Sequence, residues 1–215
     1  MHFVISDAQA RIAAAHLSRH DTCLAPVIRQ TGPCTIRPHT DYYHELVRSI
    51  IGQQLSVKAA ATITDRFTAI FAGAFPAPQA IINCPDDTLR AAGLSRSKVA
   101  YVKDLARHVL DGRIDFADIE HRSNEQIIIE LTAVKGIGEW TAHMFLMWAM
   151  GRLDVLPTGD LGVRMGMQKL YGLPTIPAPA EMIVIAEQHH WHPFESVASW
   201  YVWQYLDNAP GTPRT

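Results

Sequence analysis

The stretch IIIELTAVKGIGEWTAHMFLMWAMGRLDVLPTGD, residues 127–160, decides the fold. Ser123, with Gln126 three residues later, is the capping-box start of a first helix. The Gly-Ile-Gly sequence at 136–138 ends that helix and allows a sharp reversal that side chains would block. A second helix is predicted next, because large apolar residues recur at helical spacing. These are Trp140, Met144, Met147 and Trp148.

The predicted turn is suited to bind a phosphate. A helix that begins directly after a glycine turn points several unpaired backbone N–H groups outward, so no basic side chain is needed. The pattern L-x-x-V-x-G-I-G-x-x-T-A resembles the helix-hairpin-helix motif of DNA-binding proteins. That resemblance implies DNA contacts from Gly136, Ile137, Gly138 and Thr141. The alternative is an ordinary turn between two helices that binds nothing.

An acidic residue, Asp160, follows the hairpin after a loop that contains proline and glycine. The loop from Asp154 to Asp160 reads DVLPTGD and precedes a predicted helix over residues 161–170. Hairpin, Pro/Gly loop and acid together resemble the helix-hairpin-helix DNA glycosylase superfamily, and most closely its 3-methyladenine DNA glycosylase II family. The resemblance implies that Asp160 is the catalytic carboxylate. An Asp at a helix start is also a common N-cap, and the two roles are compatible, since a helix N-terminus keeps a carboxylate ionised.

A second candidate site lies where an apolar stripe turns polar. Leu46, Val47, Ile50 and Ile51 predict the buried face of a helix, and Gln53 and Gln54 continue that stripe. Amides are costly to bury unpaired, so they are expected in a wet or functional cleft. The same resemblance implies DNA contacts from Gln53, Gln54 and Ser56, with Gln54 as the wedge that replaces a flipped nucleotide. Leu55 is the other candidate wedge, and a simple cap on a helix break near Ser56 is the alternative.

The residue at position 140 indicates the type of reaction. In relatives that also cut the strand, a Lys two residues after the second hairpin Gly forms a Schiff base with the sugar. Here that residue is Trp140, and Lys135 lies before the turn. The resemblance therefore implies a monofunctional glycosylase of base excision repair that leaves an abasic site. It also implies a base pocket of Trp140, Met144 and Trp203, and electron-rich indoles suit cationic bases such as 3-methyladenine.

The rest of the chain predicts helices around this core. Residues 21–39 look irregular because Pro26, Pro33 and Pro38 interrupt them. A final helix is expected over residues 194–206, with Trp200 in the core. Several polar side chains are expected to be solvent-exposed: Lys98, Lys103, Arg107, His189, His190 and His192.

The expected fold is all-α, with two helical subdomains flanking a DNA-binding cleft and no convincing sheet. Residues 1–43 would pack with the C-terminal helices, residues 44–150 would form the central subdomain with the helix-hairpin-helix at 123–150, and residues 151–215 would carry the catalytic Asp. The resemblance also implies a structural Na⁺ or K⁺ on the backbone carbonyls of Thr132, Val134 and Ile137. No cofactor is expected to be required. No Cys follows Cys84, which excludes the iron–sulfur cluster that some relatives carry near the C-terminus.

Composition limits the class of protein. Lys and Arg number 19 against 21 Asp and Glu, so the chain is not held on DNA by bulk charge, although local phosphate contacts remain compatible. The longest apolar run, residues 144–150, is too short to span a membrane, and no signal peptide is recognised. We expect an intracellular monomer, cytoplasmic or nucleoid-associated, whose partner is double-stranded DNA with alkylated bases. Two other readings stay open: a non-catalytic helix-hairpin-helix DNA-binding module, and a helical interaction protein with no nucleic-acid role.

Overall fold

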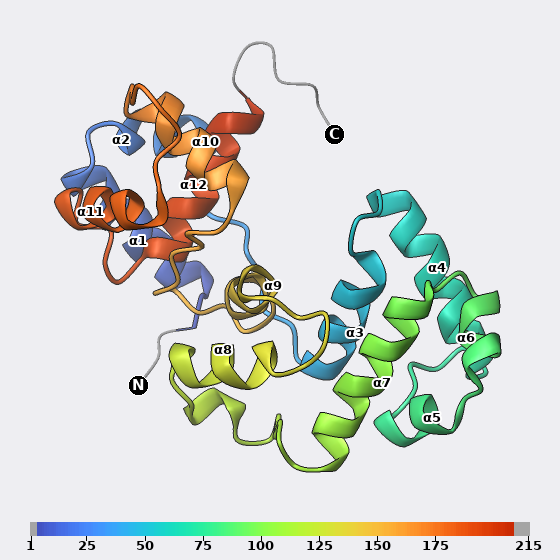
Figure 1. Cartoon of the computed structure of the whole chain (residues 1–215). Coiled ribbons are helices and arrows are strands. Elements are labelled where there is room, and N and C mark those ends of the chain that lie inside the picture. Colours follow the sequence, from blue (N-terminus) through green and yellow to red (C-terminus); the bar gives the residue numbers. More distant parts are fainter. Residues whose placement is uncertain (1–3, 209–215) are drawn as a thin grey trace. The chain divides into compact units, whose positions relative to one another are not determined.

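This computed structural model describes residues 4–208. The regular structure in this part of the chain is helical (Figure 1). Within that range the extended backbone forms no strand, only one isolated bridge between Val4 and Arg152. The predicted all-α class is confirmed. The chain divides into two compact units, an outer unit of Met1–Pro38 with Leu146–Thr215 and a central unit of His39–Phe145. The chain passes between the units after residues 38 and 145, where the sequence suggested residues 43 and 150.

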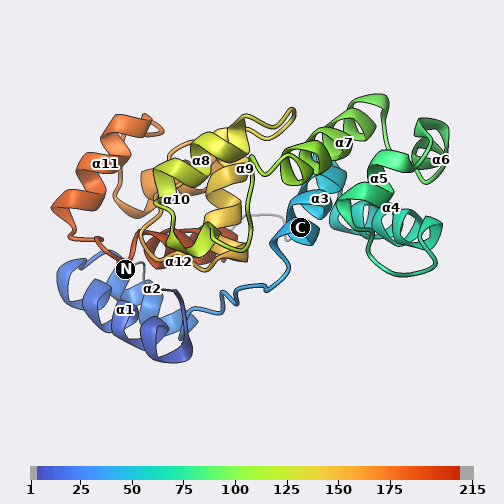
Figure 2. The ribbon, with the colours of Figure 1, turned by 90° about the horizontal axis from the view of Figure 1, so that it is seen from below.

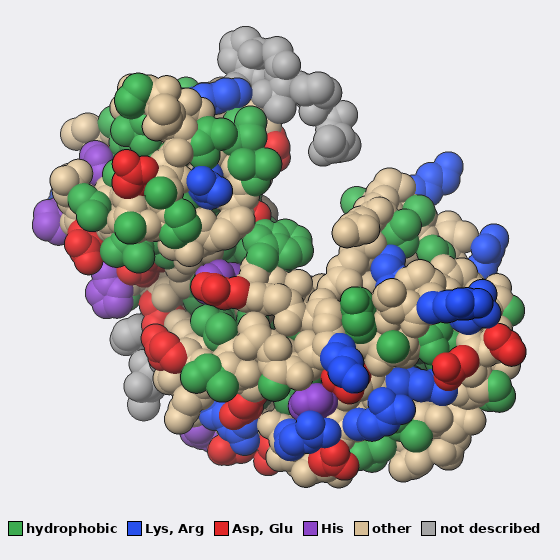
Figure 3. Space-filling model, in the orientation of Figure 1, with side chains coloured by type: hydrophobic (Ala, Val, Ile, Leu, Met, Phe, Trp, Pro, Cys, Tyr) green, Lys and Arg blue, Asp and Glu red, His purple; other side chains and the backbone are tan. Residues whose placement is uncertain are grey.

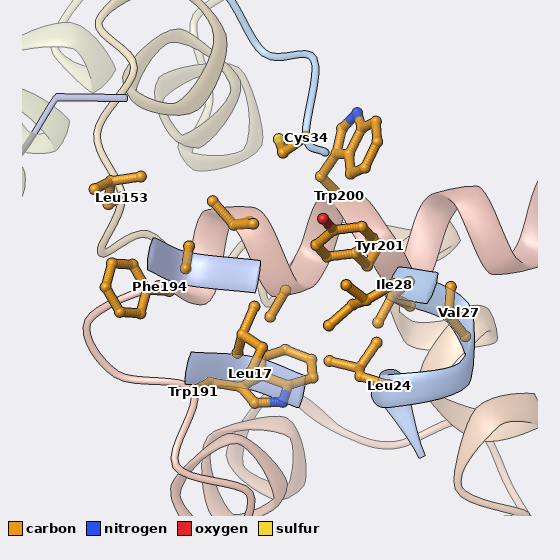
Figure 4. Close-up of a cluster of buried hydrophobic side chains, with 14 of the residues drawn as sticks. Leu17, Leu24, Val27, Ile28, Cys34, Leu153, Trp191, Phe194, Trp200 and Tyr201 are labelled. Carbon is orange, nitrogen blue, oxygen red and sulfur yellow. The ribbon is translucent and has the colours of Figure 1, made fainter. Parts of the chain in front are cut away.

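The outer unit joins the two ends of the chain around one apolar core. Figures 1 and 2 show α1 and α2 beside the C-terminal helix α12. Leu17, Trp191 and Tyr201 are fully buried in this core, and Figure 4 shows them converging from these distant segments. Trp200 is buried as predicted. The helices of the outer unit are α1 (Asp7–His20), α2 (Leu24–Thr31), α10 (Leu161–Leu170), α11 (Pro179–Gln188) and α12 (Glu195–Asp207).

A buried carboxylate ties these segments together. Asp21 is 0% exposed, and its Oδ2 accepts hydrogen bonds from the Tyr171 hydroxyl at 2.6 Å and the Trp191 indole at 2.9 Å. Its Oδ1 accepts the backbone N–H groups of Cys23 and Leu24, each at 2.9 Å, which starts α2. A buried charge is tolerated only when its oxygens are satisfied in this way.

The expectation of irregular structure over residues 21–39 is therefore wrong in part. α2 occupies Leu24–Thr31, and Pro26 lies in its first turn. A proline there loses no helical hydrogen bond, because the first N–H groups of a helix have no intrahelical acceptor. Asp21 caps this helix, but next to three prolines the sequence did not identify it as the start of a helix.

The central unit is a bundle of short helices around α7. A helix break near Ser56, which the sequence left open, is present, because α3 ends at Gly52 and α4 begins at Val57. The predicted stripe of α3 is buried, with each of its four residues at most 1% exposed. The helices are α3 (Tyr42–Gly52), α4 (Val57–Ile70), α5 (Pro78–Asn83), α6 (Asp86–Ala91), α7 (Arg96–Leu110), η1 (Ile119–His121), α8 (Asn124–Thr132) and α9 (Glu139–Met144).

The helix after the hairpin differs from the prediction. α9 has six residues and continues as a π-helical segment, η2 (Phe145–Ala149), which widens the turn. Met147 is buried, whereas Trp140 is 48% exposed. The four large residues at helical spacing thus do not form one buried stripe, and Trp140 stands at the surface of the central unit. No helix within residues 4–208 combines the length and the apolar character that a membrane span requires.

Candidate active site and nucleic-acid interface

Asp160 caps α10, as one of its two predicted roles requires. Its Oδ1 accepts the backbone N–H of Val163 at 2.8 Å, and the residue is only 8% exposed. The loop before it is fixed on the start of α12 by Ser196. The Ser196 Oγ accepts the backbone N–H of Val155 at 3.2 Å and donates to the Val155 carbonyl at 3.3 Å. Asp160 therefore sits in a defined position at the N-terminus of a helix.

Trp203 holds the same oxygen. Its indole Nε1 donates to Asp160 Oδ1 at 3.0 Å, and its ring stacks on Trp148 with centroids 5.7 Å apart and planes 25° from parallel. Gly162 makes the approach feasible, because a Cβ there would lie 2.8 Å from Trp203 Nε1. Sequence reasoning placed Trp203 beside the base and missed both the hydrogen bond and Trp148 as its partner. The recurring aromatic spacing was the only available signal for Trp148.

The hairpin is built on one required glycine. Gly136 has φ +84°, and a Cβ there would lie 2.2 Å from the ring of Tyr101 on α7. Ile137 is buried, and its N–H closes the turn on the Val134 carbonyl at 3.1 Å. Gly138, by contrast, has an ordinary φ of −99°, and a Cβ there would meet nothing within 4 Å. The expectation that the reversal requires both glycines is thus wrong, because only Gly136 needs to be a glycine. Gly138 instead leaves open space over the backbone at the start of α9.

Residues 53–56, here called the wedge loop, connect α3 to α4. Gln54 is exposed and has φ +58°, a left-handed conformation that is uncommon for a residue with a side chain. Leu55 is 38% exposed, and Ser56 caps α4 by accepting the Ala59 N–H at 3.3 Å. Both candidate wedges therefore point away from the core, and the predicted choice of Gln54 stays a prediction.

Gln53 and Lys98 bind the wedge loop to its surroundings. Gln53 Nε2 donates to the Gly136 carbonyl at 2.7 Å, while Lys98 Nζ donates to the carbonyls of Ile51 at 2.7 Å and Gln53 at 2.8 Å. The expected solvent exposure of Lys98 is wrong. Burial lowers the pKa of its ammonium group below the usual value. Local sequence patterns do not indicate these bonds, because their partners lie 45 to 83 residues apart.

Lys103 also departs from the expected solvated face. Its Nζ donates to the Cys84 carbonyl at 2.8 Å and pairs closely with Asp86. Of the three cations predicted to be exposed on this helix, Arg107 alone is exposed. A Lys stem packs along apolar surface readily while its ammonium reaches backbone carbonyls, and the local pattern does not reveal this.

Wedge loop and hairpin open on one cavity of the central unit, about 850 Å³ in volume. Half-buried Met144 is absent from its lining, and Trp140 and Thr141 of α9 contribute to it. The structure thus brings together the predicted DNA contacts Gln53, Gln54, Gly136 and Thr141 with Trp140, and, within the outer unit, Asp160 with Trp203. The cavity is lined by Ser49, Gly52, Gln53, Gln54, Leu55, Ser95, Ser97, Lys98, Tyr101, Gly136, Trp140 and Thr141.

Candidate metal and histidine sites are few. Among the described residues, no group of three or more His, Cys, Asp and Glu side chains could hold a metal ion. His192 bonds to Glu195 Oε1 at 2.9 Å, and His189 is only half-exposed, with its Nδ1 3.6 Å from Asp21 Oδ1. The predicted cation site uses carbonyls instead, and Thr132, as the last residue of α8, offers one that has no helical donor. That site stays a prediction.

Comparison with known proteins gives consistent matches. The family described as "HhH-GPD superfamily base excision DNA repair protein" matches residues 47–189. DNA-3-methyladenine glycosylase 1 of Schizosaccharomyces pombe is 36% identical over 197 residues, covering 89% of this chain and 86% of the relative.

Solved structures of 3-methyladenine DNA glycosylases have the same fold. A DNA-3-methyladenine glycosidase from Bacillus halodurans superposes with a TM-score of 0.82 at 34% identity, covering 97% of this chain and 93% of that one. The Schizosaccharomyces pombe 3-methyladenine DNA glycosylase Mag1, solved in complex with abasic DNA, gives 0.76 at 36% identity, covering 89% and 95%.

The two hairpin glycines should respond differently to alanine. Gly136→Ala should lower the free energy of unfolding by about 3 kcal/mol, because it combines an unfavourable backbone conformation with a clash against Tyr101. Gly138→Ala should cost less than about 1 kcal/mol. Urea unfolding of both variants checks this, and equal losses would contradict the assigned geometry.

Proposed function

This chain belongs to the HhH-GPD superfamily of base excision DNA repair proteins, and on that premise we propose that it is a monofunctional DNA glycosylase that releases alkylated purines from duplex DNA. The observation that carries the proposal is Asp160, a carboxylate fixed by two donors on one oxygen at a helix N-terminus. A carboxylate positioned in advance can stabilise developing positive charge without reorganising during the reaction.

The reaction follows from the chemistry of the N-glycosidic bond. The target nucleotide first leaves the base stack, because the bond is inaccessible inside a duplex. As the bond breaks, the base departs with the electron pair and the sugar gains oxocarbenium character, which Asp160 stabilises. Water then adds its oxygen to the sugar carbon and releases a proton to the solvent, leaving an abasic site. Asp160 orients that water in this scheme.

Alkylated purines fit the remaining residues. A base alkylated on a ring nitrogen carries positive charge, so it leaves as a neutral molecule and does not require a general acid. The indole of Trp140, 48% exposed, offers a face on which such a cation can stack. The relatives named above are glycosylases of 3-methyladenine, which supports this substrate class.

Contacts with DNA are assigned to the central unit. The hairpin around Gly138 presents backbone N–H groups to a phosphate, and the wedge loop fills the space of the flipped nucleotide. On the face shown in Figure 3, Lys and Arg side chains gather over this unit with acidic side chains among them. Such a surface favours binding through local contacts rather than through bulk charge. A K⁺ or Na⁺ on the carbonyls of Thr132, Val134 and Ile137 would rigidify the hairpin.

One alternative keeps an observation in its favour. Because Asp160 does cap α10, a non-catalytic DNA-binding module would need no other role for it. That alternative gives no reason for Trp203 to occupy the same carboxylate oxygen, since the cap is complete without it.

The proposal predicts base release without strand cleavage. Duplex DNA treated with dimethyl sulfate should lose 3-methyladenine and 7-methylguanine on incubation with the protein, measured by chromatography of free bases. The strand should stay intact until heated in alkali, and borohydride should trap no protein–DNA adduct, because Trp140 offers no amine. A trapped adduct or a direct nick would show lyase chemistry and contradict the monofunctional assignment.

The indole N–H of Trp203 should matter more than its ring. Trp203→Phe keeps an aromatic ring to stack on Trp148 and removes the donor to Asp160. We expect kcat to fall about tenfold, the effect of one lost hydrogen bond to a charged group, with KM nearly unchanged. Single-turnover and steady-state kinetics on a defined methylated duplex measure both. A raised KM with an unchanged kcat would instead indicate that Trp203 stacks on the base.

A further inference from the structure

We infer that Lys98 and Gln53 are positioning residues that hold the wedge loop against the hairpin, so that opening of the duplex depends on them. The inference rests on the proposed function, and it concerns the step before bond cleavage. Lys98 lies in the first turn of α7, and neither residue belongs to the outer unit, which carries Asp160.

Lys98 fixes the backbone at the point where α3 ends. Its Nζ lies 2.7 Å from the Ile51 carbonyl and 2.8 Å from the Gln53 carbonyl. Carbonyls at a helix C-terminus lack helical donors and carry the negative end of the helix dipole, so an ammonium group is a favourable partner. This ammonium comes from another helix, so α7 is bound to the start of the wedge loop.

Gln53 continues the connection to the hairpin. Its backbone carbonyl accepts from Lys98, and its side-chain amide donates to the Gly136 carbonyl at 2.7 Å. Gly136 in turn lies directly over Tyr101, three residues beyond Lys98 on α7. Lys98, Gln53 and Gly136 thus form a closed brace that is anchored at both ends on one helix.

The brace explains the conformation of the neighbouring residue. Gln54 follows Gln53 directly and adopts φ +58°. A residue with a side chain persists in this conformation only where its surroundings hold it. With the preceding carbonyl and side chain both bonded, the loop presents Gln54 and Leu55 outward in one arrangement. A wedge must resist the base stack that it enters, so a fixed loop performs this task better than a mobile one.

Lys103 provides a matched control on the same helix. It too is a lysine that bonds a backbone carbonyl, that of Cys84 at 2.8 Å, and it pairs with Asp86. Neither partner belongs to the wedge loop or the hairpin. Lys103→Met therefore removes a comparable bracing contact without touching the proposed opening step.

The test measures duplex opening without requiring catalysis. A duplex carries a tetrahydrofuran abasic analogue with 2-aminopurine as its neighbour, and unstacking on binding raises the 2-aminopurine fluorescence. We expect wild type and Lys103→Met to give the full rise at saturation, and Lys98→Met and Gln53→Met to give less than about half of it, since both break the brace. The double variant should lose little more than either single one, because the two residues act as a unit.

Single-turnover base release gives the second readout. With the damaged base correctly paired, Lys98→Met should be about tenfold slower than Lys103→Met, whereas with the damaged base in a mismatch, which is cheaper to unpair, the difference should shrink to about twofold. Equal losses on both substrates would show a merely structural role and overturn the inference. So would a full fluorescence rise with Lys98→Met, or none with wild type.

The two readouts separate the failure of this inference from that of the proposed function. If wild type opens the duplex and Lys98→Met does not, yet neither releases base, the brace stands and the glycosylase assignment falls. If wild type releases base and Lys98→Met matches Lys103→Met in both assays, the glycosylase assignment stands and the brace falls.

Discussion

One carboxylate oxygen, Oδ1 of Asp160, joins the packing of the outer unit to its proposed chemistry. It accepts a backbone N–H of α10 and the indole N–H of Trp203 on α12. The two helices must lie close for both bonds to form, and glycines on α10 permit this. A Cβ at Gly162 would meet Trp203 at 2.8 Å, and one at Gly166 would meet Val202 at 2.4 Å. The geometry of the acid is therefore set by the packing of α10 on α12 together with the loop that Ser196 holds on the start of α12.

The outer unit contains a second carboxylate whose surroundings indicate a different role. Asp21 is fully buried and accepts two backbone N–H groups, a hydroxyl and an indole N–H. Removing it would leave several buried donors unpaired, which is a large destabilisation. Asp160 is also bonded to an indole and also caps a helix, but it keeps 8% exposure. Complete burial of Asp21 and the residual exposure of Asp160 separate a structural carboxylate from a candidate catalytic one.

Local patterns in the sequence predicted what local physics decides. The capping box of Ser123 and Gln126, the bounds of α10 and the buried stripe of α3 depend on neighbours within a few residues, and all three are present. The break between α3 and α4 at the wedge loop is also a local feature, because Ser56 caps the second helix. The candidate site residues were named largely through resemblance, and their roles stay predictions.

Contacts between distant segments could not be predicted in this way. Lys98 and Lys103 share the pattern of a solvated helix face, yet each bonds carbonyls that lie many residues away. Pro26 suggested irregular structure because the cap supplied by Asp21 was not apparent. Trp140 is 48% exposed on α9, and Trp148, which the sequence did not single out as a partner, stacks on Trp203. Each outcome depends on tertiary partners that one sequence does not reveal.

Asp160→Asn tests the central claim most directly. Asn is as good an N-cap as Asp, and its side-chain oxygen still accepts from Val163 and Trp203, so folding and DNA binding should persist while the charge is lost. We expect release of 3-methyladenine from methylated duplex DNA to fall at least about a hundredfold in single-turnover assays, with unchanged affinity for an abasic-analogue duplex. Release within about threefold of wild type would contradict the account and leave Asp160 as a cap alone.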